Sequence, residues 1–144
     1  MQRKTIYITK NDKARLDRMM LFRDLFVARE RRTMRRLDYD ISRGRVVSAE
    51  EIPPDVVTTH SQVVLEEIDG KVVFTATLVF PEDADDAHCR ISILTALGSE
   101  LIGSRTGDVI EWSSSGGTRR LRIRRTCHVP EIVPPAQGQA QGGI

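Results

Sequence analysis

The residues of this chain with the strongest chemical character are arginines. They form a basic face made of Arg29, Arg31, Arg32, Arg35 and Arg36. Guanidinium groups bind phosphates and carboxylates through paired N–H donors, so this face suits an acidic partner. Like charges three or four residues apart destabilise a helix by about 0.2–0.5 kcal/mol per pair. The arginines therefore indicate either an acidic partner or, as the alternative, a helix face that is only solvated.

Two Cys–His pairs, His88-Cys89 and Cys127-His128, are the candidates for a metal site. Structural zinc sites ordinarily contain a Cys-x-x-Cys knuckle, which neither pair has. We favour two small buried thiols instead, although the strands near these cysteines could be neighbours. The sequence also lacks a Gly-x-Ser-x-Gly nucleophile motif. We therefore expect no metal, no cofactor and no enzymatic active site.

Gly98 and Gly103 have the spacing of a phosphate-binding loop. A phosphate-binding loop has a lysine directly after its second glycine, but this chain has Ser104 there. Such a loop also follows a strand, but the sequence predicts a helix before Gly98. We interpret the two glycines as the end of a helix and the opening of a turn.

The charge of the chain is unevenly divided. Residues 1–45 have a net charge of +8, and the remaining 99 residues have a net charge of −6. The acidic part would be repelled by nucleic acid, which excludes a nucleic-acid coat around the whole protein. The longest apolar stretch, Val72–Phe80, is about half the ~20 residues of a membrane span, and residues 1–10 contain no apolar signal segment. We expect a cytoplasmic protein without membrane contact.

The N-terminal part predicts a β-prone segment and two helices. Residues 5–9 favour a strand, and Asn11 or Asp12 is expected to cap a helix over residues 12–22. A second helix is expected over residues 27–43, with an apolar stripe of Val27, Met34, Leu37 and Ile41. Joined near residues 23–26, the helices would form a short antiparallel hairpin.

The rest of the chain predicts a sheet. Residues 61–68 and 71–80 flank Asp69-Gly70, a strong β-hairpin signal, and residues 95–102 predict one short helix. Further strands are expected over residues 90–94, 108–112 and 118–127, the last with Leu121, Ile123 and Cys127 facing inward. The predicted class is α+β. Its parts are the strand and basic helical hairpin (1–45), a hinge (46–60), a small antiparallel sheet domain with one helix (61–133) and a disordered tail (134–144).

Two stretches resemble a known family. Ile91-Ser-Ile-Leu-Thr-Ala-Leu-Gly-Ser-Glu-Leu-Ile-Gly, with the following Gly107-Asp-Val-Ile-Glu-Trp112, resembles the signature of the carboxy-terminal domain of Gre transcription factors. Ser48-Ala-Glu-Glu-Ile-Pro-Pro-Asp-Val-Val-Thr-Thr-His is similar to the linker of the Gre-like regulators of nucleoside diphosphate kinase, which have a shortened coiled coil. The resemblance covers about residues 5–130.

This resemblance implies an FKBP-like sheet domain that carries a helical coiled coil and binds RNA polymerase at the rim of its secondary channel. The implied rim contacts are Leu94, Thr95, Ala96, Leu97 and Glu100. The family's Ser-Pro pair is Thr95-Ala96 here, and a small residue of its helix is Glu100.

Cleavage-active members of the family hold a magnesium ion with two acidic residues at the hairpin tip. Here the tip offers Asp24, which is followed by Leu25, Phe26 and Val27. The expected first helix would span only ~16 Å. We therefore expect a monomeric, non-enzymatic transcription regulator that competes with Gre factors and, as the resemblance implies, affects nucleoside diphosphate kinase. The alternatives are a transcript-cleavage factor, a basic hairpin that binds RNA or DNA, and a prolyl isomerase by fold analogy.

Overall fold

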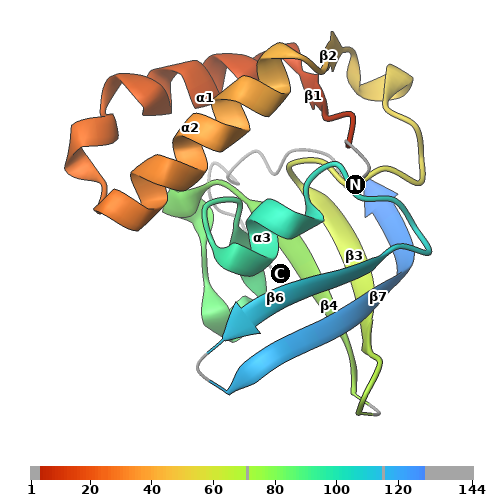
Figure 1. Ribbon diagram of the computed structural model, residues 1–144. Coiled ribbons are helices and arrows are strands. Elements are labelled where there is room, and N and C mark those ends of the chain that lie inside the picture. Colours follow the sequence, from red (N-terminus) through yellow and green to blue (C-terminus); the bar gives the residue numbers. More distant parts are fainter. Residues whose placement is uncertain (1–3, 71, 115, 129–144) are drawn as a thin grey trace, which may run out of the picture.

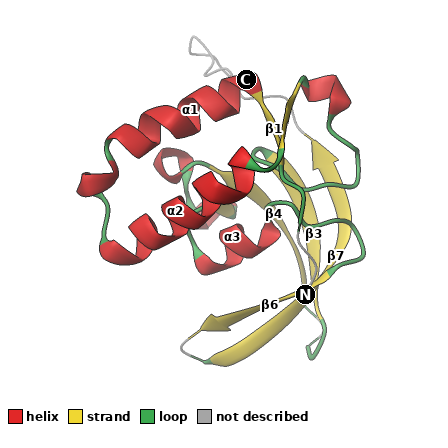
Figure 2. Ribbon diagram, turned by 45° about the horizontal axis from the view of Figure 1, so that its top comes forward, coloured by secondary structure: helices red, strands yellow, loops and turns green. Residues whose placement is uncertain are grey.

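The structure, a computed structural model, describes residues 4–70, 72–114 and 116–128. Two helices, α1 (Lys10–Leu21) and α2 (Ala28–Ser42), lie side by side above a five-stranded sheet (Figures 1 and 2). A third helix, α3 (Ala96–Leu101), lies between α2 and the sheet. The whole of the expected disordered tail, residues 134–144, lies outside the described residues.

Helix α1 begins two residues earlier than the sequence predicted. Thr9 has an extended backbone and is its N-cap, and its Oγ1 accepts the N–H of Asp12 at 3.2 Å. The choice of Asn11 or Asp12 as the cap was therefore wrong, because Thr9 already supplies the oxygen that the first turn needs. Asp12 instead lies inside the helix, where it is buried.

Helix α2 buries Met34, Leu37 and Ile41, as its stripe predicted. Val27, which was expected in the same stripe, is the N-cap residue and is 59% exposed, because its extended backbone directs it away from the helix face. Short strands β1 (Tyr7–Thr9) and β2 (Arg45–Val47) pair in parallel and close the open end of the helix pair.

The five-stranded sheet has the order β5-β4-β3-β7-β6. Its strands are β3 (Ser61–Glu67), β4 (Val73–Val79), β5 (Arg90–Ser92), β6 (Val109–Ser114) and β7 (Gly117–His128). Three neighbouring pairs are antiparallel, but β5 runs parallel to β4. The expectation of a purely antiparallel sheet was wrong at this edge because residues 80–89 carry the chain back before β5 begins.

A bulge in β7 decides which way the end of that strand faces. Ile123 pairs with Leu65 and Arg125 with Val64, so Arg124 is an extra residue. An extra residue inverts the alternation of side chains beyond it. Cys127 is consequently exposed rather than inward, and Cys89 is exposed as well. The expectation of two buried thiols was wrong for both.

One hydrophobic cluster joins the helix pair, α3 and the sheet. It includes Leu16 of α1, Leu37 of α2, Leu101 of α3 and Ile123 of β7. Within the expected hinge, residues 56–59 are buried, and the Val57 N–H donates to the Ser104 carbonyl at 2.8 Å. These contacts fix the direction of the helix pair relative to the sheet. The domain boundaries themselves, and the likeness to FKBP, stay predictions.

In the part of the chain that the structure describes, none of the helices has the length and apolar character required to cross a membrane.

Candidate functional site: a basic groove between α2 and α3

The five arginines of the basic face do not act as one surface. Arg29, Arg32 and Arg36 lie three and four residues apart and therefore form a single stripe along α2 that faces α3. Arg35 is exposed outside this stripe. Arg31 is half-buried, and its guanidinium donates to the Phe26 carbonyl just before α2. We conclude that Arg31 supports the turn between the helices, whereas the stripe faces the sheet domain.

Helix α3 is held in place by local hydrogen bonds and a close backbone approach. The hydroxyl of its N-cap, Thr95, accepts the Gly98 N–H at 2.9 Å and donates to the Ser92 carbonyl at 2.7 Å. A Cβ on Gly98 would overlap the Ser92 carbonyl oxygen, so only glycine lets α3 lie this close to β5. Gly103, with φ of +85°, turns the chain after the helix. Gly103 therefore opens the turn after a helix, as expected, but the expectation that Gly98 stands at a helix end was wrong, because Gly98 lies in the first turn of α3.

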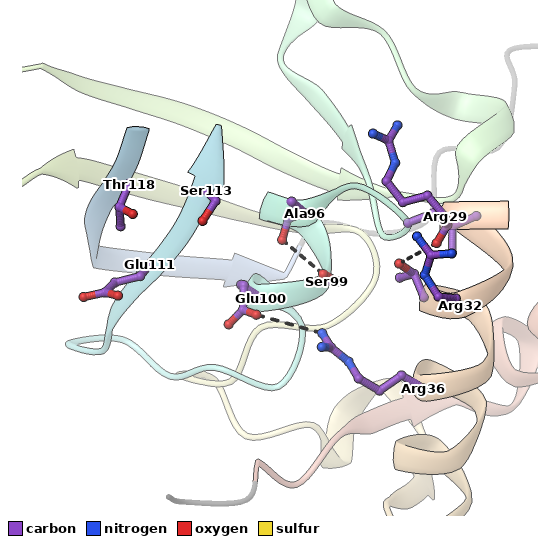
Figure 3. A pocket seen from close by; sticks show the side chains of 11 residues that line it. Arg29, Arg32, Arg36, Ala96, Ser99, Glu100, Glu111, Ser113 and Thr118 are labelled. Atoms are coloured by element: carbon purple, nitrogen blue, oxygen red, sulfur yellow. Dashed lines mark hydrogen bonds and ion pairs between the residues drawn. The ribbon is translucent and has the colours of Figure 1, made fainter. Parts of the chain in front are cut away.

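The arginine stripe and the β6–β7 pair are the two walls of one cavity, with α3 between them, and we call this cavity the α2–α3 groove. Its volume is about 590 Å³. Eleven residues line it: Arg29, Arg32, Thr33, Arg36, Leu94, Ala96, Ser99, Glu100, Glu111, Ser113 and Thr118. Figure 3 shows the arginines on one side, α3 in the middle and the β6–β7 residues on the far side.

Ion pairing inside the groove is sparse. Arg36 Nη2 lies 3.9 Å from Glu100 Oε2, and both side chains are substantially exposed, so this pair contributes at most about 1 kcal/mol. Arg29 and Arg32 form no ion pair within the described residues. The stripe therefore presents two guanidinium groups that a ligand can reach.

Lys4 ties the N-terminal segment to the end of α3. Its Nζ donates to the Glu100 carbonyl and, at 3.2 Å, to Ser104 Oγ. Burial lowers the pKa of Lys4, although the nearby Glu100 carboxylate opposes that change. The contact places a second cation beside Glu100, although Lys4 itself does not line the groove.

The structure brings only some of the predicted rim residues to the groove. Leu94, Ala96 and Glu100 line it, but Leu94 is 3% exposed and belongs to the core. Thr95 is exposed and Leu97 packs against the core cluster. The exposed residues that can meet a partner are thus the N-cap Thr95 and the first residue of α3, Ala96, and Glu100 of the same helix is half-buried.

Asp24 lies at the tip of the helix pair, in a single 3₁₀ turn (Arg23–Leu25), and is exposed. Around it stand four exposed apolar side chains: Leu21, Phe22, Leu25 and Val27. Glu30 lies in the first turn of α2. Along residues 22–27, Asp24 is the only acidic residue, so the tip is apolar rather than acidic.

A buried polar cluster, which the sequence did not reveal, connects α1 to the sheet domain. The Thr59 hydroxyl donates to Asp12 Oδ2 at 2.6 Å, and His60 Nε2 lies 3.4 Å from Asp12 Oδ1. Burial alone would raise the pKa of Asp12, but hydrogen bonds from His60 and Thr59 and the charge of His60 outweigh it and leave that pKa lowered. The available signal was position: Asp12 shares a helix face with Leu16 and Met19.

The two Cys–His pairs do not meet. Cys127 pairs with Gln62, Gln62 with Thr77, and the Thr77 N–H bonds to the Cys89 carbonyl, so two strands separate the cysteines. Three strand spacings amount to ~14 Å. Among the described residues, there is no group of three or more His, Cys, Asp or Glu side chains that could hold a metal ion.

The fold and its sequence place the chain in a known family. The family model for the C-terminal domain of the transcription elongation factors GreA and GreB matches residues 52–125. The chain belongs to the GreA/GreB family. The resemblance expected from residues 48–60 and 91–112 is therefore confirmed.

Among its relatives, the regulator of nucleoside diphosphate kinase of Escherichia coli strain K12 is 33% identical over 98 residues, which are 67% of this chain and 72% of that protein. Transcription elongation factor GreA of Chelativorans sp. strain BNC1 is 33% identical over 85 residues, 59% of this chain and 54% of that protein.

A solved structure of a GreA/GreB factor from Nitrosomonas europaea has 36% identity and a TM-score of 0.73, and the match covers 86% of this chain and all of that one. The mixed helix-and-sheet architecture is thus that of GreA/GreB proteins. The relatives are regulators and elongation factors rather than classical enzymes, and the chain is a transcription-related regulator.

Proposed function

We propose that this protein binds RNA polymerase near its secondary channel, competes there with Gre factors and does not stimulate transcript cleavage. It acts as a monomer, and the contact is made by the exposed part of α3, Thr95 and Ala96, together with Glu100. Leu94 and Leu97 pack into the hydrophobic core and so hold these residues at the surface. Family membership and the matched residues 52–125, which contain α3, support the choice of partner.

The tip of the helix pair is the observation that carries the non-catalytic part of the proposal. A divalent cation takes oxygen ligands, and two carboxylates at a hairpin tip would add the ligands that polymerase groups alone do not provide. Asp24 stands there among exposed apolar side chains, and Glu30 belongs to the helix behind it. With 12 residues, α1 reaches only ~18 Å.

A link to nucleoside diphosphate kinase belongs to the same proposal. The name of the Escherichia coli relative supports it. We place it downstream of transcription, as a change in the amount of the kinase. Purified protein should therefore leave the turnover of purified kinase unchanged.

The competing function is direct RNA or DNA binding by the basic face. The division of the arginines disfavours it, because Arg29, Arg32 and Arg36 face α3 and Arg31 is bonded to the Phe26 carbonyl. Binding to nucleic acid alone, without polymerase, would favour this second function.

A competition titration tests the proposal. Increasing amounts of the protein are added to stalled elongation complexes with a fixed amount of Gre factor, and transcript shortening is measured. We expect shortening to fall, and Ala96→Glu to abolish the effect. Ala87→Glu is the matched control, since Ala87 is also exposed but lies in the turn before β5.

Two results would contradict the proposal. Undiminished Gre-stimulated cleavage at excess protein would rule out a shared binding site. Magnesium-dependent shortening by the protein alone, lost in Asp24→Asn, would assign a catalytic tip.

A further inference from the structure

We propose that the α2–α3 groove is a binding site for a nucleoside polyphosphate. The phosphates would lie on Arg29 and Arg32, and the ribose on Ser113, Thr118 and Glu111 across the groove. This site does not depend on polymerase binding, and its ligand is defined by the chemistry of the two walls.

The arginine wall fits phosphate groups. Arg29 and Arg32 are one helical turn apart, so their guanidinium forks can each take one phosphate of a chain. Neither forms an ion pair within the described residues. Their mutual repulsion destabilises the free helix, and a bound anion removes that cost. The nearby Arg36, only loosely paired with Glu100 at 3.9 Å, adds a third positive charge.

The opposite wall does not fit phosphate but fits a neutral, hydroxyl-rich group. Ser113 and Thr118 are cross-strand partners of β6 and β7, so their hydroxyls lie on the same face of the sheet. Glu111, two residues before Ser113, shares that face, and its carboxylate would repel a phosphate but accept hydrogen bonds from ribose hydroxyls. Figure 3 shows these three residues on the side of the groove away from Arg29 and Arg32.

The size of the groove agrees with such a bipolar ligand. Its volume of about 590 Å³ lies within the ~300–1,000 Å³ of typical small-molecule sites. A pyrophosphate ion would occupy the arginine side only. Nucleoside di- and triphosphates combine an anionic end with a sugar and so use both walls.

Binding of GDP and ADP to the intact protein, measured by titration calorimetry in metal-free buffer, tests the site. We expect saturable binding that weakens as salt rises. Arg29→Ser and Arg32→Ser should each weaken it about tenfold or more, since each removes a charge-assisted contact. Arg35→Ser is the matched control, because Arg35 lies on the same helix outside the groove, and it should leave binding within about twofold.

The ribose wall is tested separately. The double variant Ser113→Ala with Thr118→Val should weaken GDP binding while leaving pyrophosphate binding unchanged. Guanosine without phosphates should not bind measurably. GDP should bind wild-type protein more tightly than pyrophosphate does.

Each contrary result overturns the assignment. No saturable binding of GDP or ADP would show that the groove is solvated only. An equal loss in Arg35→Ser would indicate non-specific attraction to the basic helix. If pyrophosphate bound as tightly as GDP, the proposal that the groove also binds the nucleoside part of the ligand would be refuted. If a short single-stranded RNA bound more tightly than GDP through Arg29 and Arg32, the groove would be a polynucleotide site instead. The polymerase competition assay reports on the proposed function independently of all these outcomes.

Discussion

Replacing Asp12 with alanine should destabilise the whole protein, because this buried carboxylate holds helix α1 on the sheet domain. Asp12 is 5% exposed and accepts the Thr59 hydroxyl at 2.6 Å, and Thr59 is itself 4% exposed. His60 Nε2 lies 3.4 Å from the other carboxylate oxygen. The variant would leave these partners buried without the acceptor that they face.

The size of the effect follows from these contacts. Leaving a buried donor without its acceptor costs about 1–3 kcal/mol. A negative charge lost from the first turn of a helix costs about 0.3–1 kcal/mol more. Part of this is offset because the carboxylate no longer has to be buried, so we expect a net loss of about 2–3 kcal/mol. For a domain of this size that corresponds to a fall in Tm of roughly 6–12 °C.

Thermal and urea unfolding, followed by circular dichroism, measure this loss. Asp17→Ala is the matched control: Asp17 lies on the same helix but is half-exposed, and its ion pair with Lys13 is at the surface. That pair contributes about 0.5 kcal/mol or less. Asp12→Asn, which keeps an oxygen acceptor for Thr59, should fall between the wild type and Asp12→Ala.

The pH dependence gives a second measurement. The pKa of Asp12 is lower in the folded protein than in the unfolded chain. Its stabilising contribution is therefore fully present above the unfolded value of about 3.9 and is lost as pH falls through the folded value. The difference between the wild type and Asp12→Ala should be constant above about pH 5 and shrink below pH 4. Equal stabilities of Asp12→Ala and Asp17→Ala at pH 7 would refute the reasoning.

Three further outcomes are expected. Leu16→Ala, at a fully buried position, should cost about 2–5 kcal/mol in urea unfolding. Gly98→Ala should lower the free energy of unfolding by more than about 1 kcal/mol, because its Cβ overlaps the Ser92 carbonyl; an unchanged value would contradict the close approach of α3. Cys89 and Cys127 should both react with a thiol reagent in the native protein, and protection of either until denaturation would contradict their exposure.

Much of the local structure could be predicted from the sequence. The two helices of the pair follow from an apolar spacing of three and four residues, although the start of α1 does not, and the β3–β4 hairpin follows from Asp69-Gly70. The short helix α3 follows from the helical spacing of apolar residues within residues 95–102. These signals act between residues a few positions apart, so they need no knowledge of the rest of the chain. The family resemblance rested on similarly contiguous stretches.

The arrangement of distant residues was decided by the tertiary structure alone. The parallel pairing of β5 depends on the path of residues 80–89, and the outward direction of Cys127 depends on one extra residue opposite β3. Local propensities predict neither the parallel pairing of β5 nor the direction of Cys127, because both arise from the register between strands far apart in sequence.

The candidate site shows the same division. The sequence identified the arginines but treated them as one face, whereas packing of α2 above α3 separates Arg32, which lines the groove, from Arg35, which does not. Ser113 and Thr118 carried no signal at all, because an isolated serine or threonine in a strand is ordinary. They line the groove because the core cluster fixes the angle between the helix pair and the sheet, and that angle is a property of the packed molecule.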